Sequence, residues 1–277
     1  MVNPMQWKIT GATVRGTSHI RKDLPNQDSI LCHPDSGHGL PVILAISDGH
    51  GSSKSFRSDK GSCFAVQAAV ETFREFLINV RAEIGNFTHI RQIAEEQLPK
   101  EIVRRWKTKV KDDLAAAPFS ENESAIIDGR GNDDFAYGAT LLTIAITESF
   151  IVYLQLGDGD ILTLWDNGQV EQPIPKDDRL FANETTSLCG KESWRDFRCC
   201  FQPIFDISPK LILAATDGYA NSFRDEESFL KVAPDIFGFI ESEGIDFVET
   251  NLKNWLNDAS ESGSGDDVTV GIITELR

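Results

Sequence analysis

Two apolar segments that each end in an Asp–Gly pair constrain the fold of this chain more than any other feature. Residues 42–47 read Val-Ile-Leu-Ala-Ile-Ser before Asp48, and residues 211–216 read Leu-Ile-Leu-Ala-Ala-Thr before Asp217. Such short apolar runs predict buried strands, and the glycine after each aspartate lets the backbone bend sharply. A single Asp–Gly pair is typical of an ordinary turn, but its repetition predicts carboxylates at the ends of buried strands.

Acidic residues also border two other apolar segments. Asp28 follows Asn26-Gln27 and precedes a short apolar stretch, whereas Asp266 and Asp267 stand directly before the segment 268–273. Carboxylates that are far apart in sequence can converge when strands pair, and their repulsion is relieved when a cation lies between them. Oxygen ligands without histidine or cysteine favour hard ions, so we expect Mg²⁺ or Mn²⁺ rather than zinc.

Charge and cysteine content exclude several classes of protein. The 277 residues include 27 Lys and Arg against 43 Asp and Glu, and the net charge of −16 opposes nucleic-acid binding. The five cysteines are odd in number and form no C-x-x-C pair, so neither a disulfide framework nor a zinc site is expected. We find no secretion signal and no apolar run long enough to span a bilayer. A cytoplasmic protein without membrane association is therefore expected.

Hydrophobic periodicity predicts an α+β fold. Helices are expected at 62–79, 88–114 with a break at Pro99, 225–242 and 246–259. Strands are expected at 7–15, 42–47, 137–147, 150–156, 161–165, 211–216 and 267–276, those between 137 and 165 as an antiparallel meander. Because helices and strands gather in blocks, we expect one domain over 1–277, a four-layer α-β-β-α sandwich of two mostly antiparallel sheets with a helix pair on each outer face.

Three segments lack a regular pattern. Residues 16–25 are expected to form a loop whose cations, His19, Arg21 and Lys22, are either solvated or bind an anion beside the acidic centre. Residues 115–134 are expected as an exposed loop, and 171–205 as a long excursion that covers or flanks the site. The basic residues between 104 and 111 are interpreted as the solvated face of a helix rather than a nucleic-acid surface.

Six short motifs follow one another along the chain: Gln27-Asp28, Ser47-Asp48-Gly49-His50-Gly51, Gly138-Ala139-Thr140, Gly157-Asp158-Gly159-Asp160, Thr216-Asp217-Gly218 and Asp266-Asp267-Val268-Thr269. Together they resemble those of the metal-dependent protein phosphatases, the type 2C serine/threonine family, and most of all its compact bacterial branch. They run in the family's order from about residue 7 to 275, and each is loose alone but specific in combination. The family's α-β-β-α sandwich agrees with the fold expected above.

The resemblance implies a two-metal hydrolytic site. Asp48 would bridge two Mg²⁺ or Mn²⁺ ions, and the Gly49 carbonyl would bind one of them. Asp217 and Asp266 would complete the protein shell of the other ion, and a water between the ions would attack phosphorus in line. His50 matches a position that protonates the leaving oxygen; the alternative for it is a turn residue without a proton role.

Two residues depart from the family pattern. Gln27 stands where the family has a metal-binding Glu, so the second ion is expected to bind more weakly or through water. Asp23 stands where the family has a phosphate-binding Arg. The composition of the same loop suggests the hypothesis that His19, Arg21 or Lys22 supplies the missing charge for the substrate phosphate.

The remaining acids near the motifs have more modest expected roles. Asp28 is expected to lie behind the metal ligands, where it could assist Gln27. Asp133 or Asp134 would match, with a shifted register, a position where some relatives hold an extra metal ligand. Asp158 and Asp160 are expected to be turn residues, with Asp158 close behind the ligands.

The leading hypothesis is a serine/threonine phosphoprotein phosphatase with a cognate Ser/Thr kinase. A catalytically weakened regulatory or binding module is the first alternative, supported by Gln27 and Asp23 but opposed by the retained Asp48, Asp217 and Asp266. Another two-metal hydrolase, such as a phosphodiesterase or nuclease, is the second alternative, and the acidic composition weighs against it.

Overall fold

The strands of the chain form two five-stranded sheets in which all neighbouring strands are antiparallel. The computed structural model describes residues 6–83, 85–127, 132–176, 185–205 and 207–276. In spatial order, the first sheet holds β1 (Gln6–Val14), β10 (Val268–Leu276), β9 (Leu211–Ala215), β6 (Asp160–Leu164) and β7 (Val170–Glu171). The second holds β2 (Ser29–His33), β3 (Val42–Ser47), β4 (Leu141–Ile146), β5 (Phe150–Leu156) and β8 (Arg198–Pro203).

The two sheets pack face to face, as strand β3 illustrates. Its residues are all buried and alternate between two cores: Leu44 faces the other sheet, whereas Ile43 and Ala45 face the helices. This alternation follows from the two-residue period of a strand. On the opposing sheet Gly271 lies so close to Leu44 that a Cβ would come within 2.5 Å of the leucine side chain. The sheets therefore approach closely at this point because one partner has no side chain.

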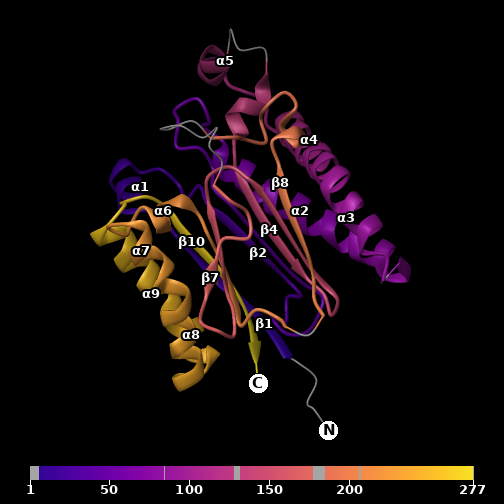
Figure 1. The fold of residues 1–277 in the computed structure, drawn as a ribbon. Helices are drawn as coiled ribbons and strands as arrows, with labels where there is room; N and C mark the ends of the chain where they lie inside the picture. Colours follow the sequence, from indigo (N-terminus) through magenta and orange to yellow (C-terminus); the bar gives the residue numbers. More distant parts are fainter. Residues whose placement is uncertain (1–5, 84, 128–131, 177–184, 206, 277) are drawn as a thin grey trace.

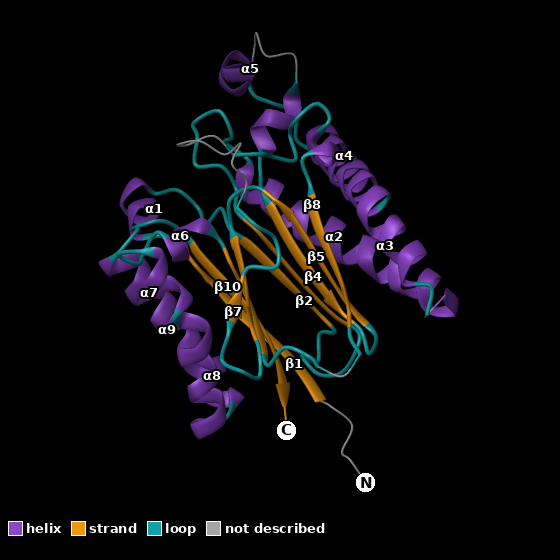
Figure 2. Ribbon diagram, in the orientation of Figure 1, coloured by secondary structure: helices purple, strands orange, loops and turns teal. Residues whose placement is uncertain are grey.

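Helices cover both outer faces of the sheet pair (Figures 1 and 2). On one side α2 (Ser58–Val80), α3 (Phe87–Glu96) and α4 (Leu98–Ala116) cover the sheet of β3, and on the other α8 (Val232–Glu243) and α9 (Ile245–Ser262) cover that of β10. Each helix buries an apolar stripe against its sheet, as the periodicity predicts. The expected four-layer α-β-β-α sandwich is confirmed.

The predicted break at Pro99 and the solvated basic face of 104–111 are both present. Pro99 lies in the first turn of α4, directly after α3 ends, where a proline costs no helical hydrogen bond. On the basic face, Arg105 pairs with Glu75 at 2.5 Å and Lys109 with Glu71 at 2.9 Å, both acids on α2. These cations therefore link two helices at the surface.

No described helix is long and apolar enough to cross a membrane.

The loop expected at 16–25 is wrong, because Thr17–Lys22 form a short helix, α1. Six residues are too few to show a helical period in sequence, and the helix is held by tertiary contacts instead. The N–H of Gly16 donates to the Asp267 carboxylate at 2.6 Å, and that of Ser18 to the Gly265 carbonyl at 2.8 Å. The segment before β10 thus determines the conformation of α1.

The predicted meander is correct only for its first hairpin: β4 and β5 pair in antiparallel fashion, but β5 and β6 belong to different sheets. The chain crosses between the sheets at Gly157-Asp158-Gly159, where Gly157 has a φ of +103° that favours glycine. Sequence pattern alone cannot show this, since a hairpin and a sheet-to-sheet crossing both need a short turn. Strand β8, in the segment 171–205, was not predicted either. Residues 177–184 of that segment lie outside the described residues.

Short elements complete the fold. Residues 115–134, expected as a loop, contain helix α5 (Glu121–Ile127) and a 3₁₀ turn over Asp133–Tyr137, while 128–131 lie outside the described residues. The remaining elements are α6 (Asp217–Ala220), α7 (Glu226–Leu230) and 3₁₀ turns at Arg81–Glu83 and Ser193–Arg195. Helices α1, α6 and α7 lie at one end of the sandwich (Figure 1).

Candidate active site

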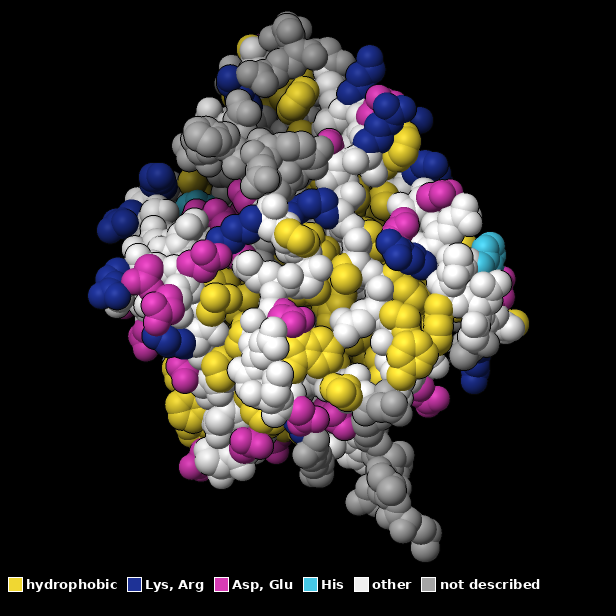
Figure 3. Space-filling model, viewed as in Figure 1, with side chains coloured by type: hydrophobic (Ala, Val, Ile, Leu, Met, Phe, Trp, Pro, Cys, Tyr) yellow, Lys and Arg dark blue, Asp and Glu magenta, His cyan; other side chains and the backbone are white. Residues whose placement is uncertain are grey.

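A polar cleft of about 1670 Å³ lies where β3, β9 and β10 meet α1 and α6. Charged side chains of both signs gather over α1, α6 and α7 on the face seen in Figure 3. Acids predominate over bases among the ionisable lining residues, so an unliganded cleft has a negative potential that favours cations. These lining residues are Asp48, Asp158, Asp160, Asp217, Asp225, Glu226 and Asp266, with Lys22, Lys176, Arg198, His19 and His50.

Asp48 lines this cleft and follows strand β3 directly. Its N–H donates to the Thr140 hydroxyl at 3.1 Å, and its carbonyl accepts from the Thr140 N–H at 2.8 Å. Burial raises the pKa of the Asp48 carboxyl well above its ordinary value, and the charges of Asp28 and Asp217 raise it further. The free carboxylate is therefore disfavoured here unless a cation balances it.

Asp217, the first residue of α6, faces Asp48 from the other sheet. Its carboxyl is hydrogen-bonded with that of Asp48, and burial raises its pKa to about 6. The side chain also accepts from Asn221 Nδ2 at 3.2 Å, one turn along the helix. The two Asp–Gly pairs that dominate the sequence thus bring their carboxylates together across the two sheets.

Asp28 lies beneath this pair rather than on the cleft wall. One carboxyl oxygen accepts from the hydroxyls of Thr216 at 2.8 Å and Thr269 at 2.7 Å. Burial raises the pKa of this carboxyl to about 7, although both hydroxyls oppose the shift. Asp28 therefore lies behind the residues that line the cleft. It is held there by Thr216, the residue before Asp217, and by Thr269, two residues after Asp267.

The neighbours Asp266 and Asp267 have opposite environments. The Asp266 side chain is 55% exposed and lines the cleft, whereas that of Asp267 is 3% exposed. Both Asp267 oxygens are engaged, by the N–H groups of Gly16 and Gln27 at 2.6 Å each and by the His19 ring at 2.8 Å. Asp267 is therefore a structural acceptor, and Asp266 is the member of the pair that faces the cleft.

Gln27 is buried and carries an unsatisfied acceptor. Its Nε2 donates to the Ser58 hydroxyl at 2.7 Å, while Oε1 has no hydrogen-bond partner. A Cβ at Gly51, on the cleft wall, would lie 3.8 Å from this oxygen. Because a buried carbonyl without a partner is costly, this oxygen suits a cation or a water held by one.

Two glycines shape the turn that follows Asp48. The N–H of Gly49 donates to the Gln27 carbonyl at 3.1 Å, and a Cβ at Gly49 would come within 2.6 Å of that oxygen. His50, on the cleft wall, packs so closely on Gly138 that a Cβ there would meet its ring at 2.4 Å. Burial lowers the pKa of His50, against the opposing charge of Asp158.

The expected phosphate-binding cations separate in space. Lys22 lines the cleft, whereas Arg21 is exposed and is not among the described residues that line it. His19 contacts the carboxylates of Asp266 and Asp267. Lys176 and Arg198 also line the cleft. Sequence reasoning missed these two residues because both lie in the segment 171–205, which has no periodic pattern.

The other expected acids also separate. Asp158 and Asp160 line the cleft, where Asp160 accepts from Gln172 Nε2 at 2.9 Å. Asp133 and Asp134 are not part of the described lining, and Asp134 pairs with Lys107 on α4 at 3.3 Å. The structure therefore brings together Asp48, Asp217 and Asp266 but not the pair at 133–134.

The donor set of the cleft fits hydrated divalent cations. Carboxylates converge with a carbonyl oxygen that has no partner, which matches the oxygen ligands of Mg²⁺ and Mn²⁺. In the described part of the chain, no three His, Cys, Asp or Glu side chains are close enough to hold an ion by themselves. Water and backbone carbonyls would therefore supply part of the shell, as is usual for Mg²⁺.

Comparison with known proteins gives one family and one fold. The family model of protein phosphatase 2C matches residues 15–257. The catalytic domain of the serine/threonine phosphatase PstP, in complex with two manganese ions, has a TM-score of 0.57 at 18% identity, covering 99% of this chain and 100% of that one. No curated protein sequence matches the chain.

Two further solved structures show the same fold. The serine/threonine phosphatase PstP/Ppp of Mycobacterium tuberculosis has a TM-score of 0.56 at 17% identity, covering 97% of this chain and 98% of that one. Stp1, a serine/threonine phosphatase from Staphylococcus aureus, has a TM-score of 0.58 at 16% identity, covering 97% and 94%. At such identities the structural likeness concerns the fold.

Proposed function

Because the chain belongs to the protein phosphatase 2C family, we propose that its cleft hydrolyses phosphoserine and phosphothreonine on proteins with two bound Mn²⁺ or Mg²⁺ ions. The observation that carries this proposal is the meeting of Asp48, Asp217 and Asp266 on one cleft wall from three distant segments. Burial of Asp48 and Asp217, which raises their pKa values, supports a site built to receive positive charge.

The residues that would hold the ions are Asp48, the Gly49 carbonyl, Asp217 and Asp266, with Gln27 contributing directly or through water. When bound, the ions supply an acidified water as nucleophile and neutralise the phosphoryl oxygens. The cations of the chain that line the cleft, Lys22 among them, would orient the phosphate. We propose that His50, on the cleft wall, gives a proton to the serine or threonine oxygen as the P–O bond breaks.

The proposed reaction is tested by phosphate release from a phosphothreonine peptide with Mn²⁺, with Mg²⁺ and with a chelator. We expect release that requires either metal and no release from a phosphodiester. Absence of release in both metals, while calorimetry still shows Mn²⁺ binding, would favour the regulatory module. Hydrolysis of the diester would favour the phosphodiesterase or nuclease alternative.

Replacing Gln27 with Glu is expected to tighten Mn²⁺ binding. The new carboxylate would stand where Oε1 now lacks a partner, and an added charge at a partly buried site contributes on the order of 1.4 kcal/mol, or about tenfold in Kd. Calorimetric titration of the purified protein with MnCl₂ measures the change. Gln67→Glu, on α2, controls for the added charge, and an unchanged affinity in Gln27→Glu would place Oε1 out of reach of both ions.

Removing the Lys22 side chain is expected to weaken substrate binding. Lys22 lines the cleft one residue before Asp23, which stands in place of the family's arginine. A partly solvated cation–phosphate contact contributes about 1 kcal/mol, so Lys22→Ala should raise KM for the phosphopeptide about fivefold with kcat nearly unchanged. Arg21→Ala is the matched control and should leave KM unchanged. A rise of KM in Arg21→Ala but not in Lys22→Ala would instead assign phosphate binding to Arg21.

The proposed substrate is a phosphoprotein modified by a Ser/Thr kinase, and we propose a reducing compartment such as the cytoplasm. All five cysteines are free thiols in the structure, which supports a reducing environment. A cognate kinase would be identified by its ability to phosphorylate a protein that this chain then dephosphorylates.

A further inference from the structure

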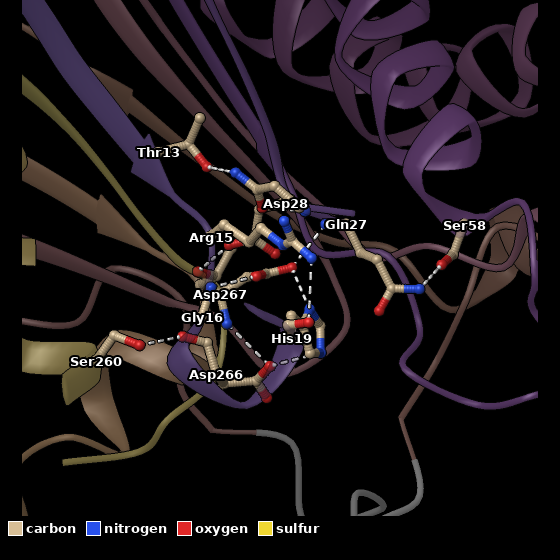
Figure 4. Close-up of polar contacts among 12 residues, drawn as sticks. Thr13, Arg15, Gly16, His19, Gln27, Asp28, Ser58, Ser260, Asp266 and Asp267 are labelled. Atoms are coloured by element: carbon tan, nitrogen blue, oxygen red, sulfur yellow. Dashed lines mark hydrogen bonds and ion pairs between the residues drawn. The ribbon is translucent and has the colours of Figure 1, made fainter. Parts of the chain in front are cut away.

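We propose that His19 is a positioning residue that holds Asp266 at the cleft while Asp267 anchors the other side of its ring (Figure 4). The inference rests on the proposed function, in which Asp266 binds a cation. It assigns to His19 a role other than contact with the substrate phosphate.

The anchor is a buried hydrogen bond between His19 and Asp267. His19 Nδ1 lies 2.8 Å from Asp267 Oδ2, and the two side chains are 9% and 3% exposed. A carboxylate only accepts hydrogen bonds, so the Nδ1–H is the donor to Asp267, and the ring attracts Asp266 as well when its Nε2 also carries a proton. Asp267 is itself held by the N–H groups of Gly16 and Gln27 at 2.6 Å each, which leaves the carboxylate no freedom to turn.

The opposite ring nitrogen points to Asp266. His19 Nε2 lies 3.5 Å from Asp266 Oδ1, and this same oxygen accepts from the Asp267 N–H at 2.9 Å. No described residue hydrogen-bonds to Asp266 Oδ2, so that oxygen stays available to a cation. Since the Asp266 side chain is 55% exposed, the contact with the histidine restricts a side chain that would otherwise sample several rotamers.

This arrangement leaves His19 poorly suited to bind phosphate. Both ring nitrogens face carboxylates, and a phosphate would have to approach between two groups of its own charge. Groups that orient a metal ligand contribute strongly to metal affinity, typically 10- to 100-fold when removed. A loss of metal affinity is therefore the effect that separates positioning from phosphate contact.

The test is a set of His19 variants titrated with MnCl₂ by calorimetry on the whole chain. In His19→Asn the shorter amide still reaches Asp267 but not Asp266, so the Mn²⁺ Kd is expected to rise about 10-fold or more with little loss of stability. In His19→Gln the longer amide reaches the Nε2 position, and the Kd is expected to stay within about threefold of wild type. His89→Asn is the matched control, because His89 is an exposed histidine of α3 that pairs with Glu83 at 3.2 Å.

Each outcome distinguishes the inference from the proposed function. Absence of Mn²⁺ binding by the wild-type chain would remove the proposed metal centre. Wild-type binding with unchanged affinity in His19→Asn would overturn the positioning role alone. An increase in KM for a phosphopeptide at saturating Mn²⁺, without loss of Mn²⁺ affinity, would overturn it in favour of phosphate contact. If His19→Asn does not fold, weak Mn²⁺ binding by folded His19→Gln would likewise contradict the inference.

Discussion

Replacing Asp48 with Asn is expected to lower phosphatase activity by at least about 10³-fold, the equivalent of about 4 kcal/mol of transition-state stabilisation. Asp48 lies at the centre of the carboxylate group, so its charge contributes to holding both proposed ions. Asp217→Asn should have a similar effect, because its carboxyl is paired with that of Asp48. The measurement is kcat/KM for a phosphothreonine peptide at saturating Mn²⁺.

The same Asp48 variant is expected to be more stable than wild type when metal is removed. In the chelated wild-type protein, burial and neighbouring carboxylates disfavour the charged form of Asp48, as its raised pKa shows. An acid with a raised pKa in the folded state destabilises that state at neutral pH, and asparagine carries no charge. The melting temperature of chelated Asp48→Asn should exceed that of chelated wild type by a few degrees, on the order of 1 kcal/mol.

Adding Mn²⁺ should reverse this order. The ions bind the folded wild-type chain and raise its melting temperature by mass action, whereas the variant should respond little. Asp35→Asn, in the exposed turn between β2 and β3, controls for the loss of a carboxylate elsewhere. Full activity in Asp48→Asn, or an equal Mn²⁺ response in both proteins, would contradict the proposed centre.

Replacing Asp267 with Ala is expected to destabilise the fold by about 3–5 kcal/mol. Its two oxygens accept from Gly16, Gln27 and His19, three groups on two segments of the chain. Alanine would leave all three donors buried without a partner. The free energy of unfolding, measured with urea in the presence of chelator, reports this loss directly.

The adjacent Asp266→Ala is the matched control for that experiment. Its side chain is 55% exposed and its role is proposed to be in metal binding, so its unfolding free energy should change by no more than about 1 kcal/mol. Its Mn²⁺ affinity, by contrast, should fall. Equal stability of the two variants would show that Asp267 is not the structural member of the pair.

Much of the fold could be predicted because its signals are local. Buried strands β3 and β9 appear as continuous apolar runs, and α2, α4 and α9 appear as helical stripes that each pack on a sheet. Several elements that escaped prediction are short, and two of them, α1 and β8, are held by distant partners. A six-residue helix has fewer than two turns, too few to reveal a period, and the sequence of β8 shows neither strict alternation nor a long apolar run.

Part of the site was determined by the sequence alone. Asp48 and Asp217 end buried strands next to glycines, and both the apolar runs and the Asp–Gly pairs can be recognised in the sequence without a structure. The sequence also determined the oxygen-rich character of the site. These features follow from composition and local backbone freedom alone.

Only the tertiary structure decided which of the adjacent Asp266 and Asp267 faces the cleft, and which of Arg21 and Lys22 does. Consecutive side chains leave the backbone in different directions, so two neighbours with the same chemistry can have opposite environments. The crossing between sheets after β5 also depends on tertiary structure, because β6 pairs with β9 of the other sheet and not with β5. Local pattern specifies what an element is, whereas packing against distant segments specifies where each side chain acts.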